Sequence, residues 1–206
     1  MFVASIVITA VLALGNWWSR LTDNNRAEEI TKPLVTVGAI AIALTGGGQT
    51  KLVAVCVIAL LFCLVGDVAL LPRVNKFIVG LAAFLVGHLA FDVMFFVDGL
   101  RSARLGGLAL VLVGIIGAIA APTILRGAAS HKLSRPVGMY LLVISSMVVF
   151  SWATKNWAAM AGSVAFIVSD TILGWREFVA KRPWMPVAIM VTYHAAIALL
   201  AVAPRI

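Results

Sequence analysis

The chain has 206 residues, of which 63% are hydrophobic and 12% are charged, and its formal net charge is +8. A soluble domain carries about 25% charged residues, so this composition and a mean hydropathy of +1.09 exclude an ordinary soluble domain. The positive charge does not indicate nucleic-acid binding, because the Lys and Arg residues occupy short connectors between apolar runs rather than one face of a helix.

Eight apolar runs follow one another along the chain and predict eight membrane-spanning helices. The runs cover residues 2–19, 33–47, 52–72, 76–98, 105–125, 136–154, 157–178 and 184–203. Because they are long, continuous and without the alternation of barrel strands, we expect an all-α membrane protein with one transmembrane domain over residues 1–206. The connectors 20–32 and 126–135 are too short for a soluble domain, so any chemistry must take place within the helix bundle or at its mouths.

The distribution of basic residues predicts the orientation of these spans. The connectors after the first, third, fifth and seventh runs contain eleven Lys and Arg residues, and the opposite side contains five. The positive-inside rule places the side with eleven in the cytoplasm. We therefore expect a multi-pass protein of the cell membrane with both termini outside.

An internal repeat emerges when the sequence is shifted by 103 residues. The basic-Pro pair at 32–33 then aligns with the one at 135–136, and the Val-small-Asp segment at 65–67 aligns with 168–170. After a three-residue insertion, His88 aligns with His194. Pro, Asp and His are scarce in this chain, so their agreement defines the register. This self-similarity predicts two four-helix halves of parallel topology, about 1–103 and 104–206.

The repeat and the orientation together place the polar residues of the spans near one end of the bundle. Asp67 and Asp170 lie near the ends of spans that finish on the basic side, and Tyr140 lies one turn inside a span that begins there. His88 and His194 lie deeper, close to the middle of the membrane. We therefore expect a polar site that opens toward the cytoplasm.

Asp67, Asp170 and His88 are the candidate catalytic residues. A carboxylate within a span costs about 2.5–3.5 kcal/mol on insertion scales, so two of them require a reason. We predict that both line a water-accessible pocket; the alternative is that each pairs with a basic residue at the mouth or caps a neighbouring helix. His88 follows Gly87, which permits close helix approach, and Asp92 one turn later could orient its imidazole. The alternative for His88 is a hydrogen bond to a neighbouring helix.

A second group of residues is expected to bind a substrate. Lys32 and Arg135, at the predicted mouth, could bind an anionic headgroup, although basic residues at the start of a span often serve topology alone. The other candidates are Tyr140, Ser169, Tyr193 and His194, of which Tyr140 could instead be an interfacial anchor. The chain has no H-E-x-x-H, G-x-S-x-G or P-loop motif, and we expect neither a metal nor a cofactor.

The segments LVGDVALL, FLVGHLAF and FIVSDTILGWREF, together with KPL at 32–34, resemble the YhhN-like lysoplasmalogenase family of eight-span membrane proteins. The resemblance extends from Lys32 to the last span. Phe91 stands where the family pattern has a tyrosine, and the sequence 193–196 reads Tyr-His-Ala-Ala where a tyrosine followed by Ala-Gln is expected. These differences bear on the substrate more than on the fold.

The resemblance implies hydrolysis of the vinyl ether bond of a lysophospholipid, lysoplasmalogen, to a fatty aldehyde and a glycerophospho-alcohol. Such a bond breaks when an acid protonates its β-carbon and water attacks the resulting oxocarbenium ion, a demand similar to that of glycoside hydrolysis. Asp67 and Asp170 would divide the roles of acid and carboxylate, and His88 would orient groups or relay protons. Either aspartate could be the acid, with Asp170 favoured because Lys32 lies nearer Asp67 in its own half.

Two other functions are consistent with the same residues. Parallel repeats with intramembrane carboxylates are also found in small transporters and proton-coupled permeases. A hydrolase acting on a different lysolipid is the second alternative, and the departures at Phe91 and His194 favour it. In every case the expected surroundings are the lipid bilayer and a small amphiphile or solute, without nucleic acid; the sequence predicts no oligomeric state.

Overall fold

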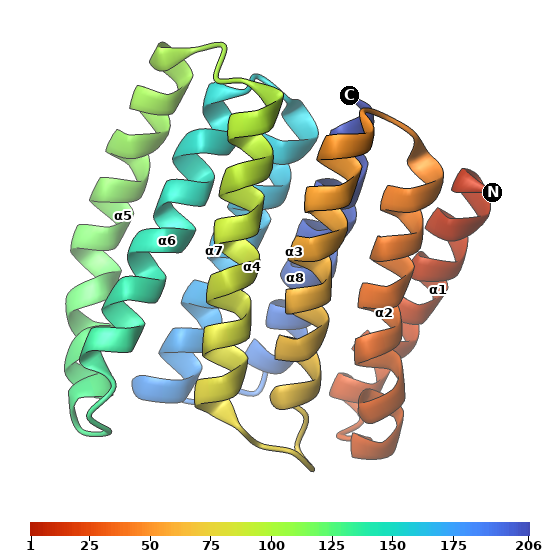
Figure 1. Cartoon of the computed structure of the whole chain (residues 1–206). Coiled ribbons are helices and arrows are strands. Elements are labelled where there is room, and N and C mark those ends of the chain that lie inside the picture. The colour runs from red at the N-terminus through yellow and green to blue at the C-terminus, as the bar shows by residue number, and fades with distance from the viewer.

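The computed structural model describes all 206 residues and contains eight α-helices and no strand, which confirms the all-α prediction (Figure 1). The helices are α1 (Phe2–Leu21), α2 (Asn25–Gly46), α3 (Thr50–Ala69), α4 (Phe77–Asp98), α5 (Ala103–Ala129), α6 (Ser134–Ala153), α7 (Trp157–Phe178) and α8 (Met185–Val202), and a short 3-10 helix, η1 (Ala203–Arg205), follows. Each α-helix has the length and hydropathy of a membrane span, so the chain is a multi-pass membrane protein.

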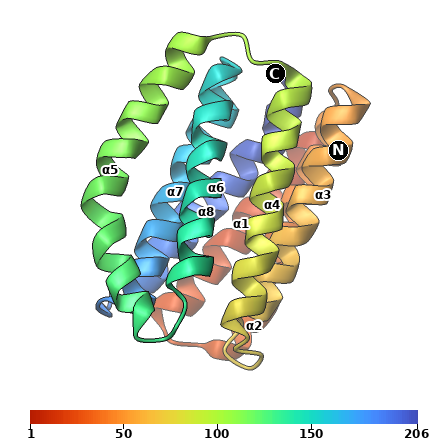
Figure 2. The ribbon, with the colours of Figure 1, turned by 60° about the vertical axis from the view of Figure 1, so that its left-hand side comes forward.

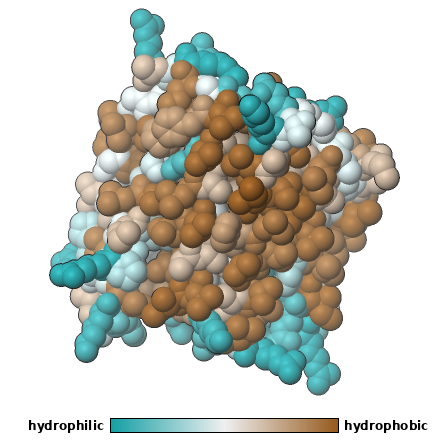
Figure 3. Space-filling view, in the orientation of Figure 1, coloured by the Kyte–Doolittle hydropathy of each residue, from teal (hydrophilic) through white to brown (hydrophobic).

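The surface of the bundle matches a bilayer. Figure 3 shows hydrophobic residues over the middle of one face and hydrophilic residues gathered at its two ends. Large apolar side chains point outward in the middle of the spans; Ile119 is 74% exposed and Leu142 is 73% exposed. Such exposure is unfavourable in water and favourable against lipid tails. Both termini lie at the same end of the bundle, as eight spans require (Figure 1).

The second helix begins earlier than its apolar run predicted. The run starts at Pro33, whereas α2 starts at Asn25, and its first two turns are polar. Asn24 caps the helix by accepting a hydrogen bond from the backbone N–H of Ala27. Glu28, in the first turn, pairs with Arg20 at the end of α1. Hydropathy therefore marked only the apolar part of a longer helix, and the α1–α2 connector is three residues long rather than thirteen.

Two other helix ends differ from prediction. The third span was expected to continue to residue 72, but α3 ends at Ala69 and residues 70–76 form a turn in which Asn75 adopts a φ of 47°. Asp67 therefore lies in the last turn of its helix. The fifth span was expected to end at residue 125, but α5 continues to Ala129. Pro122 lies within this helix and does not end it.

The helices pack mainly as consecutive pairs: α1 with α2, α3 with α4, α5 with α6, and α7 with α8. The two halves of the chain meet where α2 packs on α8 and where α4 packs on α6. Exchanging the two halves replaces α2 by α6 and α8 by α4, so the α2–α8 contact becomes the α4–α6 contact. Two parallel halves related by a repeat are expected to show this correspondence. Figure 1 shows α1 and α5, the equivalent first helices, at opposite margins of the bundle, and Figure 2 shows α5 standing at the edge of the bundle.

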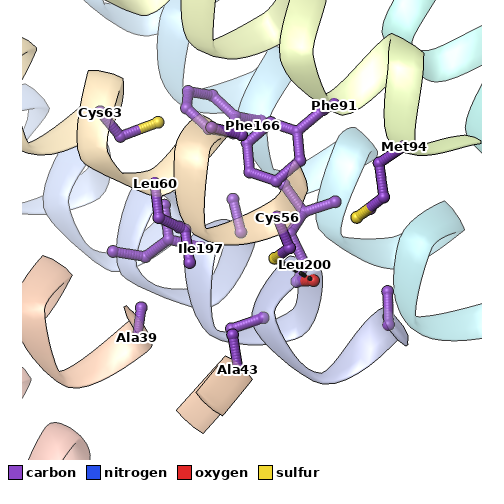
Figure 4. Packing of buried hydrophobic residues seen from close by; sticks show 14 of the residues in the cluster. Ala39, Ala43, Cys56, Leu60, Cys63, Phe91, Met94, Phe166, Ile197 and Leu200 are labelled. Atoms are coloured by element: carbon purple, nitrogen blue, oxygen red, sulfur yellow. Dashed lines mark hydrogen bonds between the residues drawn. The ribbon is translucent and has the colours of Figure 1, made fainter. Parts of the chain in front are cut away.

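The core is built from α2, α3, α4, α6, α7 and α8, with Ala13 of α1. Figure 4 shows how side chains from these helices fill the interior, and the residues labelled there are Ala39, Ala43, Cys56, Leu60, Cys63, Phe91, Met94, Phe166, Ile197 and Leu200. The Sγ atom of Cys56 donates to the carbonyl oxygen of Leu200 at 3.5 Å, which joins α3 to α8. Small residues on α2 and α3 alternate with the large aromatic residues of α4 and α7, so that the helices approach closely.

Gly66 allows the closest approach of α3 to α4. A Cβ atom at this position would lie 2.5 Å from a ring carbon of Phe84, whereas a Cβ atom at Gly114 on α5 would meet nothing within 4 Å. We predict that Gly66→Leu lowers the stability of the detergent-solubilised protein by about 1–3 kcal/mol, because overpacking forces the helices apart. Thermal unfolding measures this loss. Gly114→Leu is the matched control, and an equal loss in both variants would contradict the packing argument.

Candidate active site

A polar cavity lies between α2, α3, α4, α7 and α8. Arg20 at the end of α1, Asn75 in the α3–α4 turn and Pro186 at the start of α8 line its mouth, so the cavity opens at the end of the bundle that carries those connectors. Its charged lining comprises Arg20, Glu28, Lys32, Asp67, Asp170, Arg176 and Glu177. Both candidate aspartates therefore face one cavity and not the lipid.

Asp67 is fully buried and has three polar partners at the bottom of this cavity. Lys32 Nζ lies 3.6 Å from Asp67 Oδ1, and both side chains are almost completely buried. The hydroxyl groups of Thr36 and Tyr193 both donate to Asp67 Oδ2, the second at 2.8 Å. These partners come from α2 and α8. A buried ion pair with further hydrogen bonds is the arrangement that stabilises an ionised carboxylate away from water.

The local fold makes a cation necessary beside Asp67. The residue occupies the last turn of α3, where the unpaired backbone carbonyl groups carry partial negative charge and disfavour another anion. Lys32 compensates for this, and it reaches the carboxylate because α2 starts seven residues before it. The early start of α2 therefore positions the partner of Asp67.

Asp170 has a different set of partners. The phenol of Tyr140, on α6, donates to Asp170 Oδ2, and His88 Nε2, on α4, lies 3.9 Å from the same oxygen. No Lys or Arg side chain lies within ion-pair distance of Asp170. One carboxyl group of the cavity thus has a fixed cation, and the other has only a phenol and an imidazole.

An apolar pocket adjoins the polar cavity, and Asp170 is the only charged residue in its lining. The two spaces share Asp170 and the apolar residues Leu70, Phe77, Phe84 and Leu173. Beyond these, the pocket continues between α4, α5, α6 and α7. The Asp170 carboxyl group therefore lies at the boundary between a polar and an apolar space.

The two aspartates occupy equivalent places in the fold. Asp67, on the third helix of the first half, contacts the second helix of its own half through Thr36 and the fourth helix of the other half through Tyr193. Asp170, on the third helix of the second half, contacts the second helix of its own half through Tyr140 and the fourth helix of the other half through His88. Each carboxyl group is thus held by both halves of the chain.

Several predicted site residues present no free polar group to the cavity. Arg135 is exposed on the first turn of α6 and lines neither space. His194 is stacked on Trp17 of α1 and accepts a hydrogen bond from its indole N–H at 3.0 Å. Ser169 lines the cavity, but its hydroxyl donates to the carbonyl oxygen of Ile189 and joins α7 to α8. His88 approaches Asp170 but lines neither space.

No direct hydrogen bond joins Asp92 to His88, which the sequence suggested that Asp92 could orient. Asp92 Oδ2 accepts a hydrogen bond from Ser146 on α6 at 2.7 Å, and neither ring nitrogen of His88 has a hydrogen-bond partner. Edge-on contacts with Phe166 and Tyr140, at ring-centroid distances of 4.5 and 5.2 Å, hold the imidazole instead.

Two further residues belong to the site although the sequence did not single them out. Thr36 is fully buried and donates to Asp67. Arg176 is half-buried, lines the cavity and makes no ion pair, so it is a cation free to meet an anionic group. Helical periodicity could have found Arg176, because cavity residues on α7 recur at 169, 170, 173, 176 and 177, a single face of the helix. No group of three or more His, Cys, Asp and Glu side chains has the geometry of a metal site.

The fold and the site define a class of protein: an eight-span membrane bundle with two buried carboxyl groups in a polar cavity that adjoins an apolar pocket. The chain belongs to the YhhN family, whose family model matches residues 27–203. The match runs from the first turn of α2 to η1 and leaves α1 outside. It confirms the family resemblance of the sequence.

Curated relatives agree with this assignment. The chain is 33% identical to "Lysoplasmalogenase TMEM86B" of Mus musculus over 144 residues, which is 69% of this chain and 59% of the relative. It is 31% identical to "Lysoplasmalogenase TMEM86A" of Bos taurus over 157 residues, which is 70% of this chain and 62% of the relative. The chain thus spans about three-fifths of the length of these relatives. No solved structure matches the chain.

The Lys32–Asp67 pair generates a stability prediction. Lys32→Met leaves the Asp67 carboxylate buried without a cation, and loss of one partner of a buried pair costs about 3–5 kcal/mol. We predict that the double variant Lys32→Met/Asp67→Asn recovers most of this loss, because no buried charge remains. Unfolding of all three proteins in the same detergent measures the coupling. Additive losses in the double variant would contradict the pairing.

Proposed function

We propose that the protein hydrolyses the vinyl ether bond of lysoplasmalogen and releases a fatty aldehyde and a glycerophospho-alcohol. One observation carries the proposal: the Asp170 carboxyl group lies where the polar cavity meets the apolar pocket. In a lysoplasmalogen the vinyl ether bond joins the polar glycerophospho-alcohol to the hydrocarbon chain. A molecule that places each part in the matching space presents this bond to Asp170. The names of the curated relatives support the same reaction.

The charged lining fits the polar part of such a molecule. Arg176, which has no ion-pair partner, is placed to meet the phosphate of the headgroup. Lys32 also lines the cavity, and its ammonium group pairs with Asp67. The hydrocarbon chain fits the apolar pocket, whose lining is hydrophobic apart from Asp170 and Gly174.

The two carboxyl groups divide the acid–base chemistry. A carboxyl group that is buried without a cation is favoured in its neutral form, so we assign Asp170 as the acid that protonates the β-carbon of the vinyl ether. The oxocarbenium ion that results is stabilised by the Asp67 carboxylate, which Lys32 keeps ionised. Asp67 then accepts a proton from the attacking water, and the hemiacetal collapses to aldehyde and alcohol.

The proposed orientation places this chemistry on the cytoplasmic side of the cell membrane. The cavity opens at the end that carries the connectors with eleven basic residues, and both termini lie at the opposite end (Figure 1). The positive-inside rule then puts the mouth in the cytoplasm and the termini outside. Substrate would reach the site from the inner leaflet.

We predict that the purified protein releases fatty aldehyde from lysoplasmalogen, and that Asp67→Asn and Asp170→Asn each lower this rate at least about 100-fold, because each removes a proton-transfer group. Asp98→Asn is the matched control: Asp98 lies at the other end of α4, bonded to Arg101, and its loss leaves the rate unchanged. Aldehyde is measured by a coupled dehydrogenase assay, with size-exclusion profiles to confirm folding.

Three results of this assay would contradict the proposal. An absence of aldehyde from the wild type excludes the reaction, and fatty acid released from an acyl lysolipid tested in parallel assigns the site to a different lysolipid hydrolase. Flux of unaltered solute into proteoliposomes assigns it to a transporter. Full activity in Asp67→Asn and Asp170→Asn refutes the two-carboxyl mechanism.

The apolar pocket predicts chain-length selectivity. Leu81 lines this pocket and not the polar cavity, so Leu81→Trp fills the space where the hydrocarbon chain would lie. We expect a roughly 10-fold or larger loss of kcat/KM for long-chain lysoplasmalogen and little loss for a short-chain analogue, since each buried CH2 contributes about 0.8 kcal/mol. Leu112→Trp, in the apolar groove between α5, α6 and α7, is the control. A loss that is independent of chain length would contradict the assignment.

A further inference from the structure

His88 and Asp92 form a buried polar pair on α4 that the two-carboxyl reaction does not use. They are four residues apart, so their side chains lie on the same face of the helix, one turn from each other. His88 is 0% exposed and Asp92 is 7% exposed. Three of their atoms have no hydrogen-bond partner: Nδ1 and Nε2 of His88 and Oδ1 of Asp92.

Unpartnered polar atoms at this depth require an explanation. A buried donor or acceptor without a partner costs about 1–3 kcal/mol, and almost all such groups in proteins are satisfied by protein atoms or by ordered water. One water molecule between Nδ1 of His88 and Oδ1 of Asp92 would give each of these two atoms a partner, while Nε2 of His88 faces Asp170 at 3.9 Å. Buried waters of this kind bridge groups that are too far apart for direct contact.

The proposed reaction requires a source of protons for Asp170, and the His88–Asp92 pair is placed to provide one. Asp170 gives its proton to the substrate carbon, and the attacking water gives a proton to Asp67. The hemiacetal then rearranges to aldehyde and alcohol with no net change in protons. Each turnover therefore leaves Asp170 without a proton and Asp67 with one. The proton on Asp67 can pass to water in the polar cavity, but Asp170 must gain a proton before the next turnover.

We propose that His88 and Asp92, joined by a buried water molecule, return a proton to Asp170 after each turnover. A proton from the solvent, which balances the one that Asp67 releases there, reaches Nδ1 through the bridging water, and the imidazolium then gives the proton on Nε2 to Asp170 Oδ2, which lies 3.9 Å away. Asp92 is a positioning residue: its carboxylate holds that water and balances the transient positive charge of the imidazole. This inference rests on the proposed function, because the need for a proton at Asp170 arises from that reaction.

The surroundings of the pair suit this role. Ser146 fixes one oxygen of Asp92 and leaves the other free for water. Phe166 and Tyr140 hold the ring of His88 from the sides without occupying its nitrogen atoms. Neither residue of the pair lines the polar cavity, so the space proposed for the headgroup does not include them.

The test is Asp92→Asn, which keeps an oxygen to accept the hydrogen bond from Ser146 but removes the negative charge. We expect rapid release of one aldehyde per enzyme molecule, followed by a steady-state rate roughly 10- to 100-fold below that of the wild type, because only proton return is impaired. Ser145→Ala is the matched control. Its hydroxyl group donates to the backbone carbonyl oxygen of Leu141 on the same helix and does not contact Asp92, so this variant should show neither the burst nor the slow steady state. An Asp92→Asn variant that slows the first turnover as much as later ones, or that behaves like the wild type, overturns the proposal while the proposed function stands.

A second measurement does not depend on activity. The chain contains three histidines, so selective ¹⁵N-histidine labelling gives few imidazole signals, and a His88→Gln variant identifies that of His88. The proposal expects a cross-peak between the His88 ring proton and water in the wild type that weakens in Asp92→Asn. A His88 signal without contact to water overturns the proposal, even if the wild type releases no aldehyde and the proposed function fails.

Discussion

The burial of two carboxyl groups among apolar helices is the constraint on which this structure depends. A carboxyl group in such surroundings must meet a cation or keep a proton, since an isolated buried charge is too costly. Asp67 meets Lys32 and two hydroxyl groups, whereas Asp170 meets a phenol and an imidazole. The different partners are the physical basis on which we assign the ionised role to Asp67 and the acid role to Asp170.

The helices are arranged so that each aspartate receives partners from two other helices. Each aspartate lies on the third helix of its half and meets the second helix of that half and the fourth helix of the other. Neither half could complete its own site, because Tyr193 and His88 come from the opposite halves. The polar cavity thus lies where the two halves meet, and close approaches such as that of Gly66 to Phe84 bring the helices together around it. In the inferred proton return, Asp92 lies one turn beyond His88 on α4 and supports the contact of His88 with Asp170.

Much of the fold could be predicted from hydropathy alone, because membrane spans must be long and apolar. The eight spans and the prominence of Asp67 and Asp170 follow from that rule and from the rarity of charge within spans. The start of α2 could not be predicted in this way, since residues 25–32 are polar and are held in a helix by the cap at Asn24 and the pair between Glu28 and Arg20. Side-chain partners were harder still. Asp92 contacts Ser146 on another helix, and Arg135 points away from the cavity, because the rotation of each helix in the bundle is decided by packing.

The central claim is that one amphiphile occupies both spaces with its polar–apolar junction at Asp170. An experimental structure with a saturated alkyl-ether lysophospholipid tests this most directly, because that analogue lacks the double bond that would be protonated. The account predicts the ether oxygen beside the Asp170 carboxyl group, the phosphate near Arg176 and the chain in the apolar pocket. An analogue bound in the groove between α5, α6 and α7, or with its chain outside the pocket, would contradict it.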